Sequence, residues 1–398
     1  MLKLRKIGLL ALVTGIAFVF AVTLLPLTGC GDDDNDDGKN PTENPTDIMS
    51  LPPMKDQFST YFMIGNIFNP GDVSGSSVTN ARLTRHYNIL TAENNMKPQY
   101  ISSPSQGSYN WTMADNMVNA AKASGFNVVG HTLLWHSQNA GWMNSSNCTP
   151  ANMKTYITAV VDHFKGKIYS WDVLNEAFPD GVSATADWKT AMRTNNPWFA
   201  NQGSDFVYEG FLAARLADPG AILYYNDYNL NETGKATMVR NMVRDVNAQY
   251  LTGSDKPAGE AAGRLLIEGI GMQSHHNTGV SAYSIGVSLN LFRPLGVKIS
   301  ISELDVLGQT YQQFASVGQG ANKHGSTTVT EQGLSTQTRL YGDYFNVFLN
   351  NADIIERVTF WGVTDNQSWR SAGLPLLFDP DGKAKPAYYK VIETLNNR

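Results

Sequence analysis

Cysteine, positive charge and long apolar runs are all scarce in this chain. Two cysteines in 398 residues cannot build a disulfide-stabilised scaffold. The 30 basic residues are outnumbered by 35 acidic ones, so the chain lacks the positive charge typical of nucleic-acid-binding proteins. Only residues 7–27 form a long apolar run, which excludes a protein with several membrane spans. A hydrophobic fraction of 42% is nevertheless ample for a large folded core.

The net charge is concentrated near the start of the chain. Residues 1–30 carry a charge of +3, residues 31–50 carry −6, and all later residues together carry only −2. An uncharged apolar stretch follows the first three cations and ends in Leu27-Thr28-Gly29-Cys30. A branched apolar residue and two small residues before a cysteine resemble the signal of a bacterial lipoprotein, in which the cysteine thiol carries lipid. An ordinary secretory signal or an uncleaved membrane anchor is the alternative.

We therefore expect three segments. Residues 1–29 would be a lipoprotein signal peptide, and residues 30–52 an acidic flexible tether that begins at the lipidated Cys30. Residues 53–398 would form a single folded domain. An acidic tract directly after the lipidated cysteine resembles lipoproteins sent to the outer face of some Gram-negative bacteria. The expected location is therefore the outer membrane, at the cell surface, with Cys30 as the anchor.

Short runs rich in Val, Ile and Tyr alternate with longer helix-like segments after residue 60. We expect eight strands, at 61–68, 87–94, 126–135, 168–175, 221–227, 265–273, 297–304 and 357–363. Helices are expected between them, at 112–124, 151–165, 204–217, 232–248 and 330–350, with caps at Thr112, Thr149 and Ser204. This alternation predicts an α/β fold, a closed (β/α)8 TIM barrel. An open doubly wound sheet is the alternative, weakened by the lack of a Gly-x-Gly-x-x-Gly motif after the first strand.

Polar and aromatic residues follow nearly every predicted strand. In such a barrel the carboxyl ends of the strands carry the active site. Glu176 and Glu303 end the fourth and seventh strands, so their side chains can face one another across the barrel mouth. Paired carboxylates across a cleft suit glycoside hydrolysis. The other candidates at the strand ends are Glu93, Asn94, Lys97, His131, Trp135, Asn175, Tyr228, Gln273, His275, Asp305, Trp361 and Trp369. Their aromatic rings and amides suit a neutral polysaccharide, and no phosphate-binding glycine loop is present.

Seven motifs resemble those of glycoside hydrolase family 10, the endo-β-1,4-xylanases, and occur in the same order. They are TAENNMKP (91–98), GHTLLWHSQ (130–138), WDVLNEAF (171–178), YYNDYNL (224–230), IEGIGMQSHH (267–276), ISELDV (301–306) and FWGVTDNQSWR (360–370). The resemblance covers residues 60–395. It implies a retaining endo-β-1,4-xylanase that needs no cofactor and no metal. It also implies that Glu176 is the general acid/base and Glu303 the nucleophile.

The resemblance assigns binding roles to the other candidates as well. Asn175 would contact the 2-hydroxyl of the reacting sugar, and Tyr228 would lie on the leaving-group side. His275 with Asp305 would support the ionised Glu303. The reacting sugar's site would be lined by His131, Trp135, Gln273 and His275 and covered by Trp361 and Trp369. The next sugar on the non-reducing side would meet Glu93, Asn94 and Lys97. Pro98 stands where many relatives have Trp, which puts one wall of this subsite in doubt.

Three other functions compete with this hypothesis. One is a β-1,4-glucanase or cellulase on the same scaffold, and another is a surface glycan-binding lipoprotein without catalysis. The third is a metal hydrolase built on His131, His136, His275 and His276. It is disfavoured because the chain lacks a His-x-x-x-His helix and because His131 and His136 would face opposite sides of a regular strand. The expected partners are xylan, xylo-oligosaccharides and a membrane, with a monomeric catalytic domain and no nucleic acid.

Overall fold

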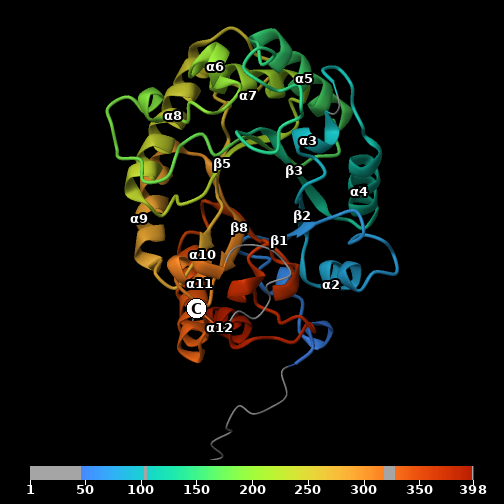
Figure 1. The fold of residues 1–398 in the computed structure, drawn as a ribbon, viewed down its shortest axis with the longest axis vertical. Helices are drawn as coiled ribbons and strands as arrows, with labels where there is room; N and C mark the ends of the chain where they lie inside the picture. Colours follow the sequence, from blue (N-terminus) through green and yellow to red (C-terminus); the bar gives the residue numbers. More distant parts are fainter. Residues whose placement is uncertain (1–45, 103–104, 318–327, 397) are drawn as a thin grey trace, which may run out of the picture. The chain divides into compact units, whose positions relative to one another are not determined.

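Eight parallel strands close into a barrel in the computed structural model, which describes residues 46–102, 105–317, 328–396 and 398 (Figure 1). The predicted signal peptide, Cys30 and most of the tether lie outside these residues. The barrel strands are β1 (Met63–Phe68), β2 (Ile89–Ala92), β3 (Asn127–Leu134), β4 (Ser170–Asn175), β5 (Ile222–Asp227), β6 (Gly269–Met272), β8 (Lys298–Val306) and β9 (Ile355–Phe360). The pairings β1–β9 and β6–β8 complete the ring, so the predicted (β/α)8 barrel is confirmed and the open sheet is excluded.

Each predicted strand corresponds to one barrel strand, with ends that shift by up to four residues. One additional strand, β7 (His275–His276), pairs with the far end of β8 through His275 and Asp305. Its two residues were expected just beyond the sixth strand. The strands are recognisable in the sequence because a parallel barrel strand is covered on both faces and therefore reads as an almost continuous apolar run.

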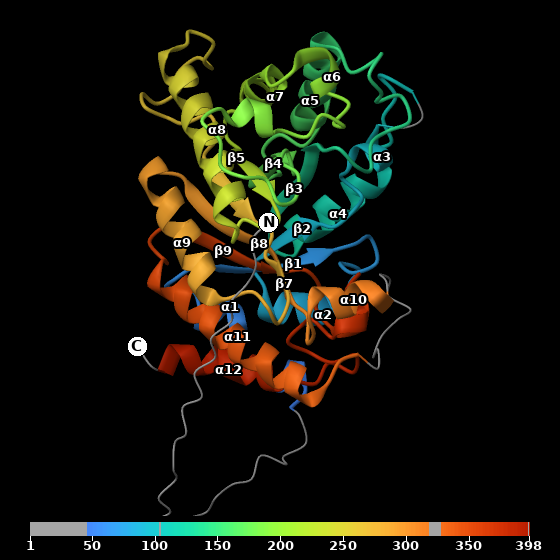
Figure 2. The same ribbon diagram turned by 60° about the vertical axis from the view of Figure 1, so that its left-hand side comes forward.

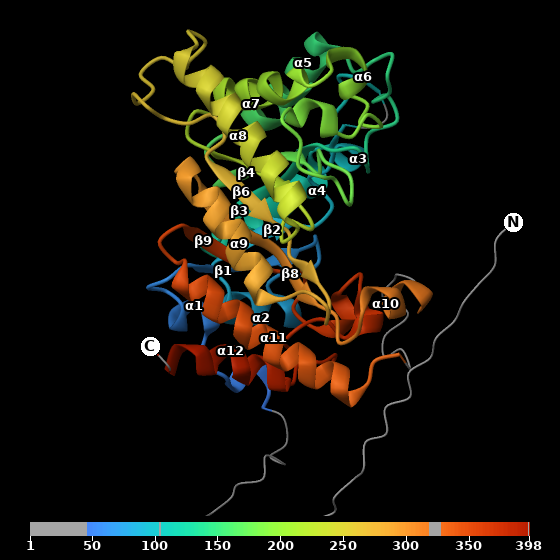
Figure 3. The same cartoon turned by 90° about the vertical axis from the view of Figure 1, so that its left-hand side faces the viewer.

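The helices surround the barrel, as Figures 2 and 3 show. They are α1 (Met54–Gln57), α2 (Val78–His86), α3 (Pro98–Ile101), α4 (Thr112–Ala123), α5 (Pro150–His163), α6 (Phe199–Gln202), α7 (Asp205–Ala217), α8 (Thr233–Thr252), α9 (Ala282–Phe292), α10 (Tyr311–Val317), α11 (Glu331–Asn350) and α12 (Pro386–Asn396). Helix α9 packs between α8 and α11, and α11 packs against α12. Among the described residues, no helix combines the length and apolar character needed to cross a membrane.

The three predicted helix caps have different outcomes. Thr149 does cap α5, because its hydroxyl accepts a hydrogen bond from the backbone N–H of Asn152 at 3.2 Å. Thr112 is instead the first residue inside α4, and the Asn110 side chain accepts its backbone N–H at 3.3 Å. Ser204 stands at the N-cap position of α7, as predicted, but its backbone is already helical and its hydroxyl makes no capping bond.

The folded unit begins earlier than the predicted tether boundary at residue 52. Ile48 is completely buried in the core, within the short 3-10 helix η1 (Ile48–Ser50). Its backbone N–H donates to Gly382 at 2.9 Å, and Asp47 pairs with Lys383. An isolated apolar residue beside an acidic tract is a weak signal in the sequence, and Ile48 is held by His86 and by Gly382, which are distant in the chain.

Candidate active site

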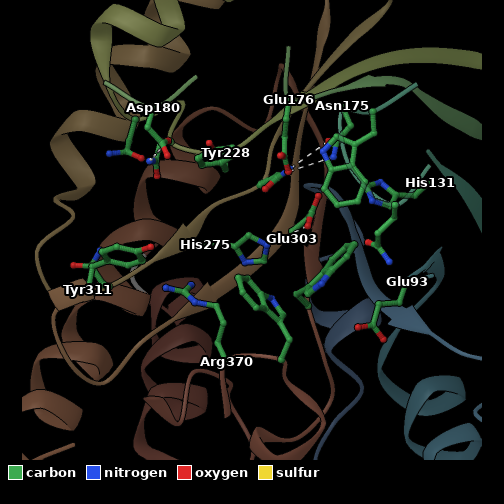
Figure 4. A pocket seen from close by; sticks show the side chains of 18 of the residues that line it. Glu93, His131, Asn175, Glu176, Asp180, Tyr228, His275, Glu303, Tyr311 and Arg370 are labelled. Carbon is green, nitrogen blue, oxygen red and sulfur yellow. Dashed lines mark hydrogen bonds and ion pairs between the residues drawn. The ribbon is translucent and has the colours of Figure 1, made fainter. Parts of the chain in front are cut away.

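A cleft of about 900 Å³ lies at the carboxyl ends of the barrel strands (Figure 4). Its walls include 13 of the 14 catalytic and binding candidates predicted from the sequence. Those residues are Glu93, Asn94, Lys97, His131, Trp135, Asn175, Glu176, Tyr228, Gln273, His275, Glu303, Trp361 and Trp369. The exception is Asp305, which is completely buried behind His275 and supports the site without facing it.

Glu176 is the first residue after β4 and has an unusual backbone conformation. Its φ of +56° lies in the left-handed region, which costs a non-glycine residue about 1–3 kcal/mol and is found mainly at functional sites. Its carboxylate oxygen Oε1 accepts hydrogen bonds from the side-chain amides of Gln273 at 2.9 Å and Asn175 at 3.3 Å. Figure 4 shows the carboxyl groups of Glu176 and Glu303 directed toward one another across the cleft.

Glu303 lies within β8 and is almost fully buried. Its Oε1 accepts a hydrogen bond from Asn226 Nδ2 at 2.7 Å, and its Oε2 lies 3.1 Å from His275 Nε2. Although burial opposes ionisation, the hydrogen bonds from His275 and Asn226 hold the pKa of Glu303 below its usual value. The carboxylate is therefore kept ionised, as attack on a carbon centre requires.

His275 is a charged link between Glu303 and the buried Asp305. Burial alone would lower its pKa, but the neighbouring Asp305 and Glu303 raise the pKa of His275 to about 9. Its Nδ1 lies 2.9 Å from Asp305, which also accepts a hydrogen bond from Arg370. At neutral pH the imidazolium thus donates to both carboxylates, and Asp305 and Arg370 fix its orientation.

This geometry predicts the pH dependence of a His275→Gln variant. Without the imidazolium, burial raises the pKa of Glu303, so the acid limb of kcat/KM is expected to move to higher pH.

Because the folded-state pKa of His275 lies above its ordinary 6.5, its stabilising contribution is complete below pH 6.5 and is lost as pH rises through about 9. The parent should therefore lose more stability than the variant between pH 7 and 10 in urea denaturation.

His163→Gln is a matched control for that comparison, because His163 lies on the outer helix α5 and pairs with Asp115. Its pH profile of kcat/KM should follow that of the parent. Superimposable acid limbs for the parent and His275→Gln would contradict the assigned role of His275.

Asn226 links the Glu303 carboxylate to Asn175, and its role as a site residue was left out of the sequence interpretation. Its Nδ2 donates to Glu303 and to Asn175 Oδ1, the latter at 3.0 Å, and its Oδ1 accepts from Ser302 at 2.6 Å. A Cβ atom at position 271 would lie 2.2 Å from Asn226 Oδ1, so Gly271 leaves the space that the Asn226 side chain occupies. An asparagine at a strand end is also typical of a turn, which hid its role.

Lys97 organises the side of the cleft around Glu93 and Asn94. It is only 6% exposed, and its Nζ donates to Asn94 at 3.1 Å and to Gln138 at 2.8 Å. The same ammonium lies 5.1 Å from the centre of the Trp135 ring. Burial lowers the pKa of Lys97, while the acidic residues of the cleft oppose that shift. Gln138 is the last residue of the motif at 130–138, but it was given no role because it lies in the loop after β3.

Trp361 and Trp369 present their rings around His275. The ring centres lie 6.1 Å and 5.4 Å from the imidazole, each in an edge-to-face arrangement. His131 contacts Trp361 in the same way at 5.6 Å and lies 2.9 Å from Asp172 through its Nδ1. These contacts fix aromatic surfaces next to Glu176 and Glu303.

The opposite side of the cleft contains Tyr228, with Asp180, Asn229 and Glu232 nearby. Lys235 Nζ lies 3.5 Å from the centre of the Tyr228 ring and 2.8 Å from Asp227. The helix α10, which follows β8 in the long polar segment 307–330, adds Tyr311 and Phe314 to the cleft wall. Residues 318–327 of that segment lie outside the described residues.

The four histidines of the metal-hydrolase alternative do not converge on one point. His131 contacts Asp172, and His136 Nδ1 lies 3.8 Å from Glu176 Oε2. His275 contacts Glu303 and Asp305, and His276 is buried against the ring of Tyr344. Within the described ranges, no group of three or more His, Cys, Asp or Glu residues is arranged to hold a metal ion.

Comparisons with known proteins agree with this geometry. The model of glycosyl hydrolase family 10 matches residues 53–394. Endo-1,4-beta-xylanase A of Thermotoga maritima is 32% identical over 367 residues, which cover 86% of this chain and 31% of that protein. An exoglucanase of Acetivibrio thermocellus is 32% identical over 362 residues, with 86% and 29% covered. The chain thus spans less than a third of the length of these two relatives.

A solved structure gives a match over most of both chains. It is the crystal structure of a family 10 xylanase from termite gut that contains a bacterial Ig-like domain. It shares 52% sequence identity and a TM-score of 0.84, and the match covers 89% of this chain and 80% of that one. The family match over most of the chain, the closed barrel and the paired glutamates lead to one conclusion: this chain belongs to glycosyl hydrolase family 10.

Proposed function

We propose that the protein is an endo-β-1,4-xylanase that hydrolyses internal bonds of xylan with retention of configuration. The observation that carries the proposal is the pair Glu176 and Glu303, which face one another in the cleft within one hydrogen-bond network. The cleft continues on both sides of this pair, toward Glu93 on one side and Tyr228 on the other. A chain bound on both sides of the cut bond is what endo-cleavage requires.

The proposed reaction has two steps. The Glu303 carboxylate attacks the anomeric carbon and forms a covalent glycosyl-enzyme bond, while Glu176 donates its proton to the departing glycosidic oxygen. Glu176 then accepts a proton from water, whose oxygen attacks the same carbon and releases Glu303 as a carboxylate. Asn175, which lies between the two carboxyl groups, is placed to bond the 2-hydroxyl of the reacting sugar. Two inversions at one carbon give net retention.

A β-1,4-glucanase is the second candidate, since one relative is an exoglucanase. Glucose differs from xylose by a hydroxymethyl group, and the cleft next to His275 is closed in by Trp361 and Trp369. Excluding a group of this size discriminates about 10- to 200-fold. We therefore expect reducing ends to be released at least tenfold faster from xylan than from carboxymethyl cellulose. Faster release from the cellulose derivative would overturn the xylanase proposal, and a folded protein inactive on both would favour glycan binding without catalysis.

We also propose that the protein is a monomeric lipoprotein of the outer membrane, anchored through Cys30 and exposed at the cell surface. The support is the sequence around Leu27-Thr28-Gly29-Cys30 and the acidic tract that follows it. In a Gram-negative host, labelled palmitate should enter the parent protein, and a Cys30→Ala variant should carry no label. Labelling of Cys30→Ala, or a parent protein found only in the soluble fraction, would contradict the anchor. Sedimentation of a version that begins at residue 46 tests the monomer.

A further inference from the structure

Arg193 connects three segments around the proposed proton donor. It follows the 3-10 helix η2 (Trp188–Ala191) in the long connection between β4 and α7, and its side chain is half-buried. Its backbone N–H donates to the carbonyl of Ala177 at 2.8 Å. Its Nε donates to the carbonyl of Glu176 at 3.1 Å, and its terminal nitrogen donates to the hydroxyl of Tyr228 at 2.5 Å. None of the sequence motifs contains this residue.

Glu176 needs such support because its own backbone is strained. The left-handed conformation at φ +56° must be stabilised by surrounding contacts. The backbone N–H of Glu176 donates to Asn226 at 2.8 Å, and Arg193 binds the carbonyl on the other side of the residue. The peptide groups on both sides of Glu176 are therefore held, which fixes the direction of its carboxyl group into the cleft.

Tyr228 is held by several neighbours as well, and Asp180 also bonds its hydroxyl. Lys235 lies 3.5 Å from its ring centre, and Arg193 binds its hydroxyl. The ring lines the cleft close to Glu176 (Figure 4). One guanidinium thus bonds both the backbone of the proton donor and the aromatic ring on the leaving-group side.

We propose that Arg193 is a positioning residue that fixes the proton donor Glu176 relative to the leaving-group sugar at Tyr228. It makes no contact with the cleft itself and acts through these two residues. A sugar packed on Tyr228 then presents its glycosidic oxygen to the Glu176 carboxyl group. A displacement of about 1 Å between reacting groups can cost about 100-fold in rate. The inference rests on the proposed glycosidase function and adds a determinant of leaving-group use.

The test compares two substrates with different leaving groups. Xylotetraose leaves a sugar that packs on Tyr228 and needs a proton, whereas 2,4-dinitrophenyl β-xylobioside leaves an anion that needs neither. For Arg193→Gln we expect kcat/KM to fall about 10- to 100-fold on xylotetraose and less than about threefold on the aryl glycoside. Arg193→Lys retains a cation and donors, so it should recover part of the loss on xylotetraose.

Tyr228→Phe supplies a second arm, because it removes only the hydroxyl, which Arg193 and Asp180 bind. It should show the same substrate dependence, and the double variant should lose less than the product of the two single losses. Arg244→Gln is the matched control, since Arg244 is exposed on α8 and pairs with Asp245. It should keep parental rates on both substrates.

Equal losses on both substrates would show a general structural role and overturn the proposal, as would parental rates on both. Urea denaturation midpoints show whether Arg193→Gln is folded. If it is not, Arg193→Lys and Tyr228→Phe are used for the comparison of the two substrates. A parent protein that releases nothing from xylotetraose or xylan would be a failure of the proposed function. If only the Arg193 proposal is wrong, the parent is active, and the ratio of kcat/KM between the two substrates is the same in Arg193→Gln as in the parent.

Discussion

Replacing Glu303 with alanine is expected to lower kcat on xylan by at least about 10⁴-fold, because removal of a covalent nucleophile eliminates the first step. The carboxylate is held between Asn226 and His275. Azide can enter the space left by the side chain. With an activated aryl β-xylobioside, we expect azide to restore turnover and to give the α-configured glycosyl azide, since it attacks from the face that Glu303 occupied.

The control for this experiment is Glu331→Gln, an exposed glutamate in the first turn of α11, which should retain parental activity. Activity of purified Glu303→Ala within tenfold of the parent, without azide, would rule out Glu303 as the nucleophile.

Replacing Glu176 with alanine is expected to have a different effect that depends on the leaving group. On xylan the loss should be about 10²- to 10⁴-fold, the usual contribution of a general acid/base. With 2,4-dinitrophenyl β-xylobioside, the first step needs no proton, so a rapid burst of phenolate should precede a slow steady state in which the glycosyl-enzyme accumulates. Azide should speed its breakdown and give the β-configured product.

The two variants together assign the roles. An α-azide from Glu303→Ala and a β-azide from Glu176→Ala place the nucleophile at Glu303 and the acid/base at Glu176. The reverse pairing of products would exchange these assignments.

The barrel and the position of Glu176 and Glu303 in its cleft were predictable because each depends on a local pattern. A buried parallel strand is a continuous apolar run, and a barrel brings the residue after each run to the same face. Glu176 and Glu303 follow from these two facts and from the motifs around them. Asn226 could have been found by the same reasoning, since it pairs in register with Asn175 on the neighbouring strand.

Other features depend on contacts that no local pattern contains. Arg193 and Gln138 lie in loops whose paths are set by packing with distant segments, and their partners are 17 to 41 residues away. Asp305 follows Glu303 by two residues, so a regular strand would place it on the same face. The end of β8 instead pairs with β7, and Asp305 is buried beneath His275. The cap predicted at Thr112 is wrong because α4 already begins at that residue, with Trp111 in the N-cap position.

The central claim is that Glu303 forms a covalent bond to the sugar. The most direct test treats the parent protein with 2,4-dinitrophenyl 2-deoxy-2-fluoro-β-xylobioside, which slows the second step, and locates the adduct by intact mass and peptide mapping. The account predicts one fluoroxylobiosyl group per chain, attached to Glu303, and hydrolysis of unmodified substrate to a β-anomer first. An adduct on another residue, or an α-anomer as the first product, would contradict it.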